Sequence, residues 1–125
     1  MIAFRPSVLL LARVAAWSFA AVIVALSVIP PDLRPETGMP RNFEHFSIYC
    51  VAGLAFGLGY DRKPVLVTIL LLIFSASIEI AQLFIPGRHA RLSDFIVDAF
   101  AMCVGLMLAS LTGRIGGRFD LKLDA

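Results

Sequence analysis

The stretch IEIAQLFIPGRHARLSDFIVDAFAMCVG, residues 78–105, decides the fold class of this chain. It places Glu79, Gln82 and Asp98 inside two otherwise apolar runs. A carboxylate in the hydrocarbon layer of a membrane costs roughly 2.5–3.5 kcal/mol on insertion scales, so it needs a partner or a function. The loop between the two runs, residues 86–94, carries arginines, a histidine and an aspartate that can supply partners. The stretch therefore predicts a polar site near one face of a membrane.

The composition is that of a membrane protein. Of the 125 residues, 59% are hydrophobic and only 16% are charged, and the mean hydropathy is +0.87. Soluble domains usually carry about 25% charged residues, so the deficit is large. The length indicates a single domain over residues 1–125. The net charge of +2 is small and the basic residues are scattered, which argues against a nucleic-acid partner.

Apolar runs long enough to cross a membrane as helices, which takes about 17–25 residues each, occur along the whole chain. They cover residues 8–29, 43–60, 65–85 and 95–111. None of them shows the short alternating pattern of a membrane β-strand. The sequence therefore predicts an all-α polytopic membrane protein with four transmembrane helices. For the first run a cleaved signal peptide is the alternative, but the apolar stretch is too long, and an uncleaved helix is the better interpretation.

Lysine and arginine predict the orientation, because they concentrate in the cytoplasmic flanks of membrane proteins. With both termini cytoplasmic, that side holds the larger set: Arg5, Arg13, Arg62, Lys63, Arg114, Arg118 and Lys122. The outer side then holds the smaller set: Arg34, Arg41, Arg88 and Arg91. We therefore expect cytoplasmic N- and C-termini, with residues 30–42 and 86–94 as outer loops.

This orientation brings polar side chains to a similar depth in the outer leaflet. Glu79 lies about six residues, or ~9 Å, from the outer end of its helix, and Asp98 lies about four residues, or ~6 Å, from its own. His45 and Tyr49 share one face at the outer start of the second helix. We expect one ligand-binding pocket, formed by His45, Tyr49, Glu79, Gln82, Arg88, Asp94 and Asp98.

Small residues predict close packing of the helices that carry this pocket. Gly53 and Gly57 continue the face of His45, and Gly105 continues the face of Asp98. Glycine at such spacing lets two helix backbones approach closely in a membrane. We therefore expect these glycines to serve packing, which in turn positions the polar side chains.

The loop residues have local roles in this prediction. Pro86 cannot donate a backbone hydrogen bond and is expected to end the third helix just before it. Ser93 is expected to N-cap the fourth helix. Arg88 has three open interpretations: a salt bridge to Glu79 or Asp94, contact with lipid headgroups, or binding of a carboxylate or phosphate through its planar guanidinium.

A pattern of H-x-x-x-Y opening one span, then E-x-x-Q-x-F-x-P-x-R, then S-D opening the next, runs through the region from about residue 41 to 105. It is carried by His45, Tyr49, Glu79, Gln82, Phe84, Pro86, Arg88, Ser93, Asp94 and Gly105. This pattern resembles the VanZ-like family of small bacterial membrane proteins. The resemblance implies a multi-pass protein of the bacterial cytoplasmic (inner) membrane. The name-giving member of that family is associated with resistance to the glycopeptide teicoplanin.

Some positions depart from the family pattern. Arg41 and Asn42 stand where an Asp-Lys pair is usual, Asp98 stands where Asn is common, and Ala101 stands where Gly is usual. Asp98 thereby adds an ionisable group to the pocket, while the missing loop aspartate removes one. These changes bear on the transfer of an activity more than on the transfer of the fold.

Three functional classes remain open. The first is a protein whose outer pocket binds or protects an envelope lipid, a lipid-linked cell-wall precursor or a glycopeptide. The second is an intramembrane enzyme with Glu79 or Asp98 as general base and His45 as acid or orienting group. The third is a small proton- or cation-coupled transporter that acts as a homo-oligomer. No metal or cofactor is expected, since the sequence lacks a Walker loop and the paired histidine spacing of a zinc site.

Overall fold

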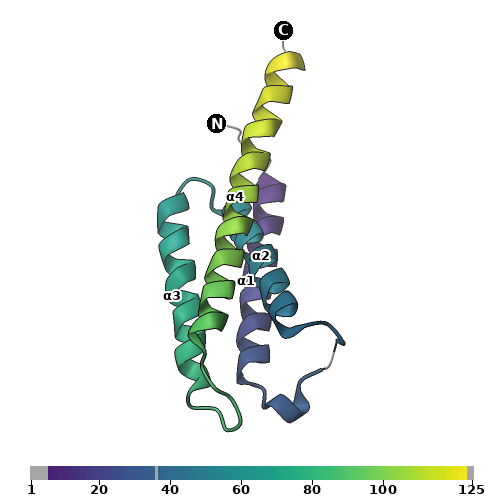
Figure 1. Ribbon diagram of the computed structural model, residues 1–125. Coiled ribbons are helices and arrows are strands. Elements are labelled where there is room, and N and C mark those ends of the chain that lie inside the picture. The colour runs from purple at the N-terminus through teal and green to yellow at the C-terminus, as the bar shows by residue number, and fades with distance from the viewer. Residues whose placement is uncertain (1–5, 36, 124–125) are drawn as a thin grey trace.

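The fold is a bundle of α-helices that alternate in direction. The computed structural model describes residues 6–35 and 37–123, with side chains as far as Arg114. It contains α1 (Pro6–Val28), the short 3-10 helix η1 (Pro31–Leu33), α2 (Arg41–Gly59), α3 (Pro64–Gln82) and α4 (Leu92–Leu123). In Figure 1, α1 and α3 run in one direction and α2 and α4 return. The start of α1 and the end of α4 therefore lie at one end of the bundle, and two connecting loops lie at the other.

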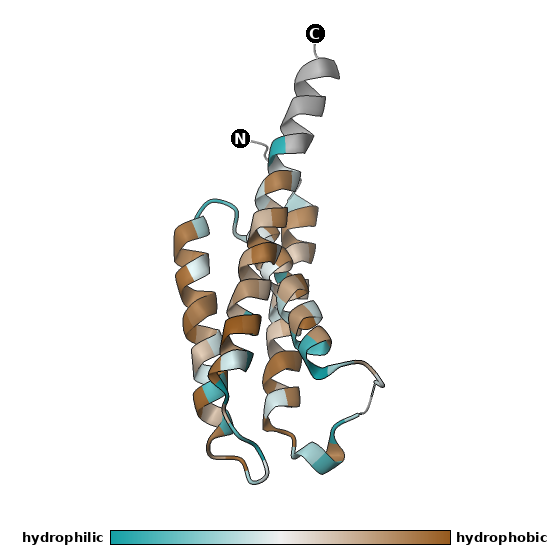
Figure 2. Ribbon diagram, viewed as in Figure 1, coloured by the Kyte–Doolittle hydropathy of each residue, from teal (hydrophilic) through white to brown (hydrophobic). Residues whose placement is uncertain are grey.

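The helices are apolar along their length and hydrophilic residues gather near the ends of the bundle, as Figure 2 shows. Three helical segments are long and apolar enough to cross a membrane: Pro6–Val28, Pro64–Gln82 and Leu92–Arg114. The remaining helix, α2, has 19 residues but includes Arg41, Glu44 and His45 near its start. The prediction of an all-α membrane fold with four helices is confirmed for the described residues.

Helix α2 packs against both α1 and α4, and small residues make this packing tight. A Cβ atom added to Gly53 would overlap the backbone oxygen of Met102, and one added to Gly105 would overlap the backbone oxygen of Cys50. Met102 is almost completely buried at this contact. The close approach predicted from the glycine spacing is therefore present, and it fixes the register of α2 against α4.

The start of α4 differs from the sequence-based prediction. Helix α4 begins at Leu92, so Ser93 lies in its first turn and is not its N-cap. The backbone oxygen of Arg91 accepts the first hydrogen bonds of the helix, from the N–H groups of Asp94 at 3.0 Å and Phe95 at 3.3 Å. The hydroxyl of Ser93 instead donates to Oδ1 of Asp94 at 3.3 Å.

Candidate functional site

The residues predicted to form a pocket come together at the loop end of the bundle, which is the lower end in Figure 1. Six of them are buried, and they come from α2, α3 and α4: His45, Tyr49, Glu79, Gln82, Asp94 and Asp98. The seventh, Arg88, lies in the α3–α4 loop and is partly buried. We use the name polar cluster for His45, Tyr49, Glu79, Gln82 and Asp98.

A histidine–aspartate pair joins α2 to α4 inside the polar cluster. Nδ1 of His45 lies 3.1 Å from Oδ1 of Asp98, and the side chain of Asp98 is fully buried. The ring of Tyr49, one turn further along α2, stacks on the imidazole with the ring centroids 6.2 Å apart. An ionised Asp98 accepts the hydrogen of Nδ1, which fixes the tautomer and the orientation of the imidazole.

Glu79 reaches the cluster from α3. Its side chain is buried, and Oε2 accepts a hydrogen bond from the backbone N–H of Arg91 at 3.3 Å. The carboxylate lies close enough to Asp98, Asp94 and His45 to interact with them electrostatically. Acidic groups from α3 and α4 therefore meet in one region of the bundle.

Several buried polar atoms of this region have no hydrogen-bond partner among the described residues. They are Oγ of Ser75, Oε1 of Glu79, Oε1 of Gln82, Nε of Arg88 and Oδ2 of Asp98. Folded proteins leave only a few buried polar groups unpaired, and such groups call for an explanation. Three of these atoms are pure acceptors on buried side chains. The cluster thus has more acceptors than the surrounding protein satisfies.

Arg88 has a different partner from those proposed from the sequence. Its Nη2 donates to the backbone oxygens of Leu26 at 2.7 Å and Ile29 at 3.0 Å, at the C-terminal end of α1. Helix C-termini leave carbonyl groups without intrahelical partners and favour a nearby cation, so Arg88 caps α1. The salt bridge to Glu79 or Asp94, one of the three interpretations left open by the sequence, is not among the ion pairs of the described residues.

The environment of Arg88 perturbs its ionisation. Burial lowers the pKa of the Arg88 guanidinium, and the positive charges of Arg34 and Arg41 add to this effect. An arginine stays protonated at physiological pH even so, because its ordinary pKa is far above that range. Arg88 therefore acts as a fixed cation that holds α1 to the α3–α4 loop.

Two ion pairs that were not predicted from the sequence lie at the loop end of the bundle. Nη2 of Arg41 lies 2.7 Å from Oδ2 of Asp94, and Nη2 of Arg34 lies 3.1 Å from Oε2 of Glu44. The hydroxyl of Thr37 also donates to Glu44. Arg41 occupies one of the positions that depart from the family pattern, so this departure has a structural use. Asp94, predicted to bind ligand, is engaged by that arginine.

The space beside the polar cluster is small. A cavity of about 30 Å³ lies between α1, α2 and the loops, bordered by Ser27, His45, Tyr49 and Arg88. This volume accommodates about one water molecule or a single functional group. Ser27 is buried on α1, and sequence reasoning missed it because it lies in an ordinary apolar run. Among the described residues, no group of three or more His, Cys, Asp and Glu side chains is placed to hold a metal ion.

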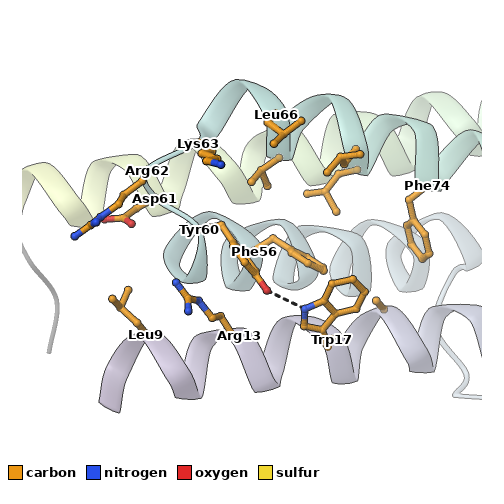
Figure 3. Close-up of a pocket in the computed structure, with 14 residues that line it drawn as sticks. Leu9, Arg13, Trp17, Phe56, Tyr60, Asp61, Arg62, Lys63, Leu66 and Phe74 are labelled. Carbon is orange, nitrogen blue, oxygen red and sulfur yellow. Dashed lines mark hydrogen bonds between the residues drawn. The ribbon is translucent and has the colours of Figure 1, made fainter. Parts of the chain in front are cut away.

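A larger cleft lies at the opposite end of the bundle and was not predicted from the sequence. It has a volume of about 720 Å³ and opens between α1, α3 and the end of α2 (Figure 3). The two sites are separate, because no residue borders both of them.

A comparison with protein families gives a match that covers most of the chain. A family model described as VanZ/LLP1 matches residues 3–113, a range that includes α1, α2, α3 and most of α4. The matched range contains every residue predicted to form the pocket. Comparisons with curated proteins and with solved structures find no match.

Proposed function

Because this chain belongs to the VanZ/LLP1 family of membrane proteins, we propose that it binds a component of the bacterial cell envelope through its polar cluster. The proposed ligand presents hydroxyl, amine or amide groups, as an envelope lipid, a lipid-linked cell-wall precursor or a glycopeptide does. The association of the family's name-giving member with teicoplanin resistance supports this choice. In the proposal, the loop end of the bundle lies in the outer leaflet of the cytoplasmic membrane.

The direction of the helices supports a multi-pass arrangement. Helices α1 and α3 run in the same direction (Figure 1). Helix α2 therefore has to run back from the end of α1 at one end of the bundle to the start of α3 at the other. Its 19 residues span ~28 Å at 1.5 Å per residue, close to the ~30 Å hydrocarbon layer of a bilayer. The polar start of α2 is shielded by ion pairs and by the polar cluster. The excess of basic residues near the termini supports their cytoplasmic location.

The observation that carries the proposal is the set of unsatisfied acceptors. Oε1 of Glu79, Oε1 of Gln82 and Oδ2 of Asp98 are buried and have no partner among the described residues. Leaving a buried acceptor unsatisfied costs about 1–3 kcal/mol, so a ligand that donates hydrogen bonds here gains affinity from each of them.

The surrounding cations indicate which chemical group fits. Arg34 and Arg41 are paired with carboxylates, and Arg88 is bound to backbone oxygens of α1. Among the buried atoms without a partner, the carboxylate and amide oxygens of Glu79, Gln82 and Asp98 outnumber the donor-capable Oγ of Ser75 and Nε of Arg88, which favours a hydroxyl or an ammonium over a phosphate. The cavity of about 30 Å³ is bordered by His45 and Tyr49 but not by the residues that carry these acceptors, so in this proposal the loops move to bring a ligand group against them.

Ligand-dependent stability in detergent tests this proposal. Thermal unfolding of the purified wild-type protein is measured with phosphatidylethanolamine, undecaprenyl phosphate or teicoplanin as the probe. We expect at least one donor-bearing probe to raise the unfolding temperature, and Glu79→Gln to weaken its binding more than tenfold, as for a lost charge-assisted hydrogen bond. Asp32→Asn, an exposed carboxylate at the same end, is the control. The proposal fails if no probe stabilises the wild type, or if both variants respond alike.

Acid–base catalysis is a second candidate function, and the His45–Asp98 pair favours it. A buried carboxylate that orients an imidazole leaves the second ring nitrogen available to take or give a proton. Mass spectrometry of membrane lipids from cells that express the wild type or His45→Gln tests this function. A lipid species that forms only with the wild type supports catalysis. Identical lipid profiles reject it for the lipids that the cell contains.

A further inference from the structure

The apolar cleft at the termini end of the bundle has the features of a lipid site. Its walls come from α1 and α3, with the end of α2 at its base, and they are mostly hydrophobic (Figure 3). The apolar residues that border it include Leu9, Phe56, Leu66, Leu70, Leu71 and Phe74. Leu66 and Leu70 are 48% and 55% exposed, so the cleft is open toward the surface that faces the hydrocarbon layer. Its volume of about 720 Å³ falls in the usual range of ligand pockets, roughly 300–1,000 Å³.

Basic residues stand at the mouth of this cleft. Arg13 comes from α1, and Arg62 and Lys63 come from the turn between α2 and α3. One acidic residue, Asp61, also borders the cleft, so positive charge exceeds negative charge there. No ion pair of the described residues involves any of these side chains. This contrasts with Arg34 at the loop end, which is neutralised by Glu44.

Arg13 is held in a defined position. Its Nε donates to the backbone oxygen of Gly59 at 2.8 Å, and its guanidinium carbon lies 5.0 Å from the centre of the Tyr60 ring. The indole N–H of Trp17 donates to the Tyr60 hydroxyl at 3.0 Å, as Figure 3 shows. Tyr60 is therefore fixed from two sides. The hydrogen bonds of the described residues use only Nε of Arg13, which leaves the Nη groups for an anion.

We propose that this cleft binds an anionic phospholipid, with an acyl chain between α1 and α3 and the phosphate at Arg13, Arg62 and Lys63. Charge complementarity selects the occupant, because an apolar groove capped by unpaired cations matches a molecule with a hydrocarbon chain and a negative headgroup. Basic pockets between transmembrane helices bind anionic headgroups in this way. Trp17 and Tyr60 are residue types that concentrate at the level of the headgroups. This site is distinct from the polar cluster in place and in charge.

Lipid-binding measurements with the full-length protein test the charge component. Binding of phosphatidylglycerol and phosphatidylcholine to the detergent-solubilised protein is compared by native mass spectrometry. We expect phosphatidylglycerol to bind more tightly, and Arg62→Gln and Lys63→Gln each to weaken it about fivefold without affecting phosphatidylcholine. Arg91→Gln removes the same charge from an exposed side chain at the loop end and should leave the preference unchanged.

Neighbouring residues on α3 test the apolar component. Leu70→Trp places a large ring in the cleft and should abolish the tight binding of phosphatidylglycerol. Ile69→Trp makes the same change at a similarly exposed residue that does not border the cleft, and it should bind like the wild type. If Leu70→Trp does not fold, the charge variants decide the matter.

Several results would overturn the lipid site. Equal binding of the two lipids by the wild type would remove the anionic preference. An equal loss in Arg91→Gln and Arg62→Gln would show a general attraction to the charged surface. Displacement of phosphatidylglycerol by inorganic phosphate would show that the cleft recognises the anion without its acyl chain.

Discussion

Nδ1 of His45 and Oδ1 of Asp98 lie 3.1 Å apart, although the two residues are distant in the sequence. This contact joins α2 to α4 in the interior of the bundle. Tyr49 covers the imidazole on one side. The close backbone contact at Gly53 and Met102 lies further along the same two helices. The packing of small residues therefore determines how the histidine meets the aspartate.

Substitution of Asp98 tests the importance of this pair. Asp98→Ala leaves a buried imidazole without a partner and should lower the free energy of unfolding by about 1–3 kcal/mol. Asp98→Asn keeps an acceptor for Nδ1 and restores the residue type common in the family, so its effect should be smaller. Chemical unfolding in detergent measures both, with the exposed Asp61→Ala as the control. An asparagine variant that is less stable than the alanine variant would contradict this interpretation.

The role of Arg88 can be separated from that of Glu79. Arg88→Ala should destabilise the protein, since it exposes unsatisfied carbonyl groups at the end of α1. The charge of Glu79 acts on Arg88, but the two side chains form no ion pair in the described structure, so the coupling between Arg88→Ala and Glu79→Gln should stay within about 0.5 kcal/mol. The free energies of unfolding of the two single variants and the double variant provide the test. A larger coupling free energy would indicate that Arg88 and Glu79 form the salt bridge considered in the sequence analysis.

The sequence was sufficient for the helices and for the composition of the polar cluster. Apolar runs of the right length predict the helices, because a membrane segment has to satisfy its own backbone hydrogen bonds. Ser75, Glu79 and Gln82 recur with helical spacing, which places them on one face of α3. All three are buried, as such a face requires when it packs against the bundle.

Partners supplied by distant segments were not predictable in the same way. Arg88 binds carbonyl groups of α1, and every helix end offers such groups, so no residue pattern marks this contact. Arg41 pairs with Asp94 only because the start of α2 lies beside the start of α4. The apolar cleft depends on how far α3 stands from α1, which the sequence of neither helix encodes alone. Ser93 was assigned as an N-cap by residue type, but the helix already begins at Leu92.

The glycines at the α2–α4 contact should be intolerant of larger side chains. Gly53→Leu and Gly105→Leu insert bulk where even a Cβ atom overlaps the opposite backbone, and overpacking of this kind typically costs about 1–3 kcal/mol. Gly113→Leu is the matched control, because a Cβ atom there meets no atom within 4 Å. Unfolding in detergent and the yield of monodisperse protein report the effect. Equal stability of all three variants would show that α2 and α4 pack differently.

The ion pair of Arg41 and Asp94 should be weak and dependent on salt. The side chain of Arg41 is 47% exposed, and pairs at the protein surface contribute about 0.2–1 kcal/mol. A double-mutant cycle with Arg41→Gln and Asp94→Asn should give a coupling in this range at low ionic strength and less at high ionic strength. A coupling free energy that does not change with salt would contradict this prediction, because it would indicate a pair that is shielded from solvent.

The orientation of the bundle is the last prediction, and it determines which membrane face each site meets. Both termini and the α2–α3 turn should lie in the cytoplasm, because they hold most of the basic residues. Reporter fusions at residue 60 and at the C-terminus should then give a cytoplasmic signal, and an insertion between residues 32 and 39 should give an external one. The anionic phospholipid would occupy the inner leaflet and the polar cluster would face the envelope. An external signal at residue 60 would exchange the two faces and end the assignment of an envelope ligand to the polar cluster.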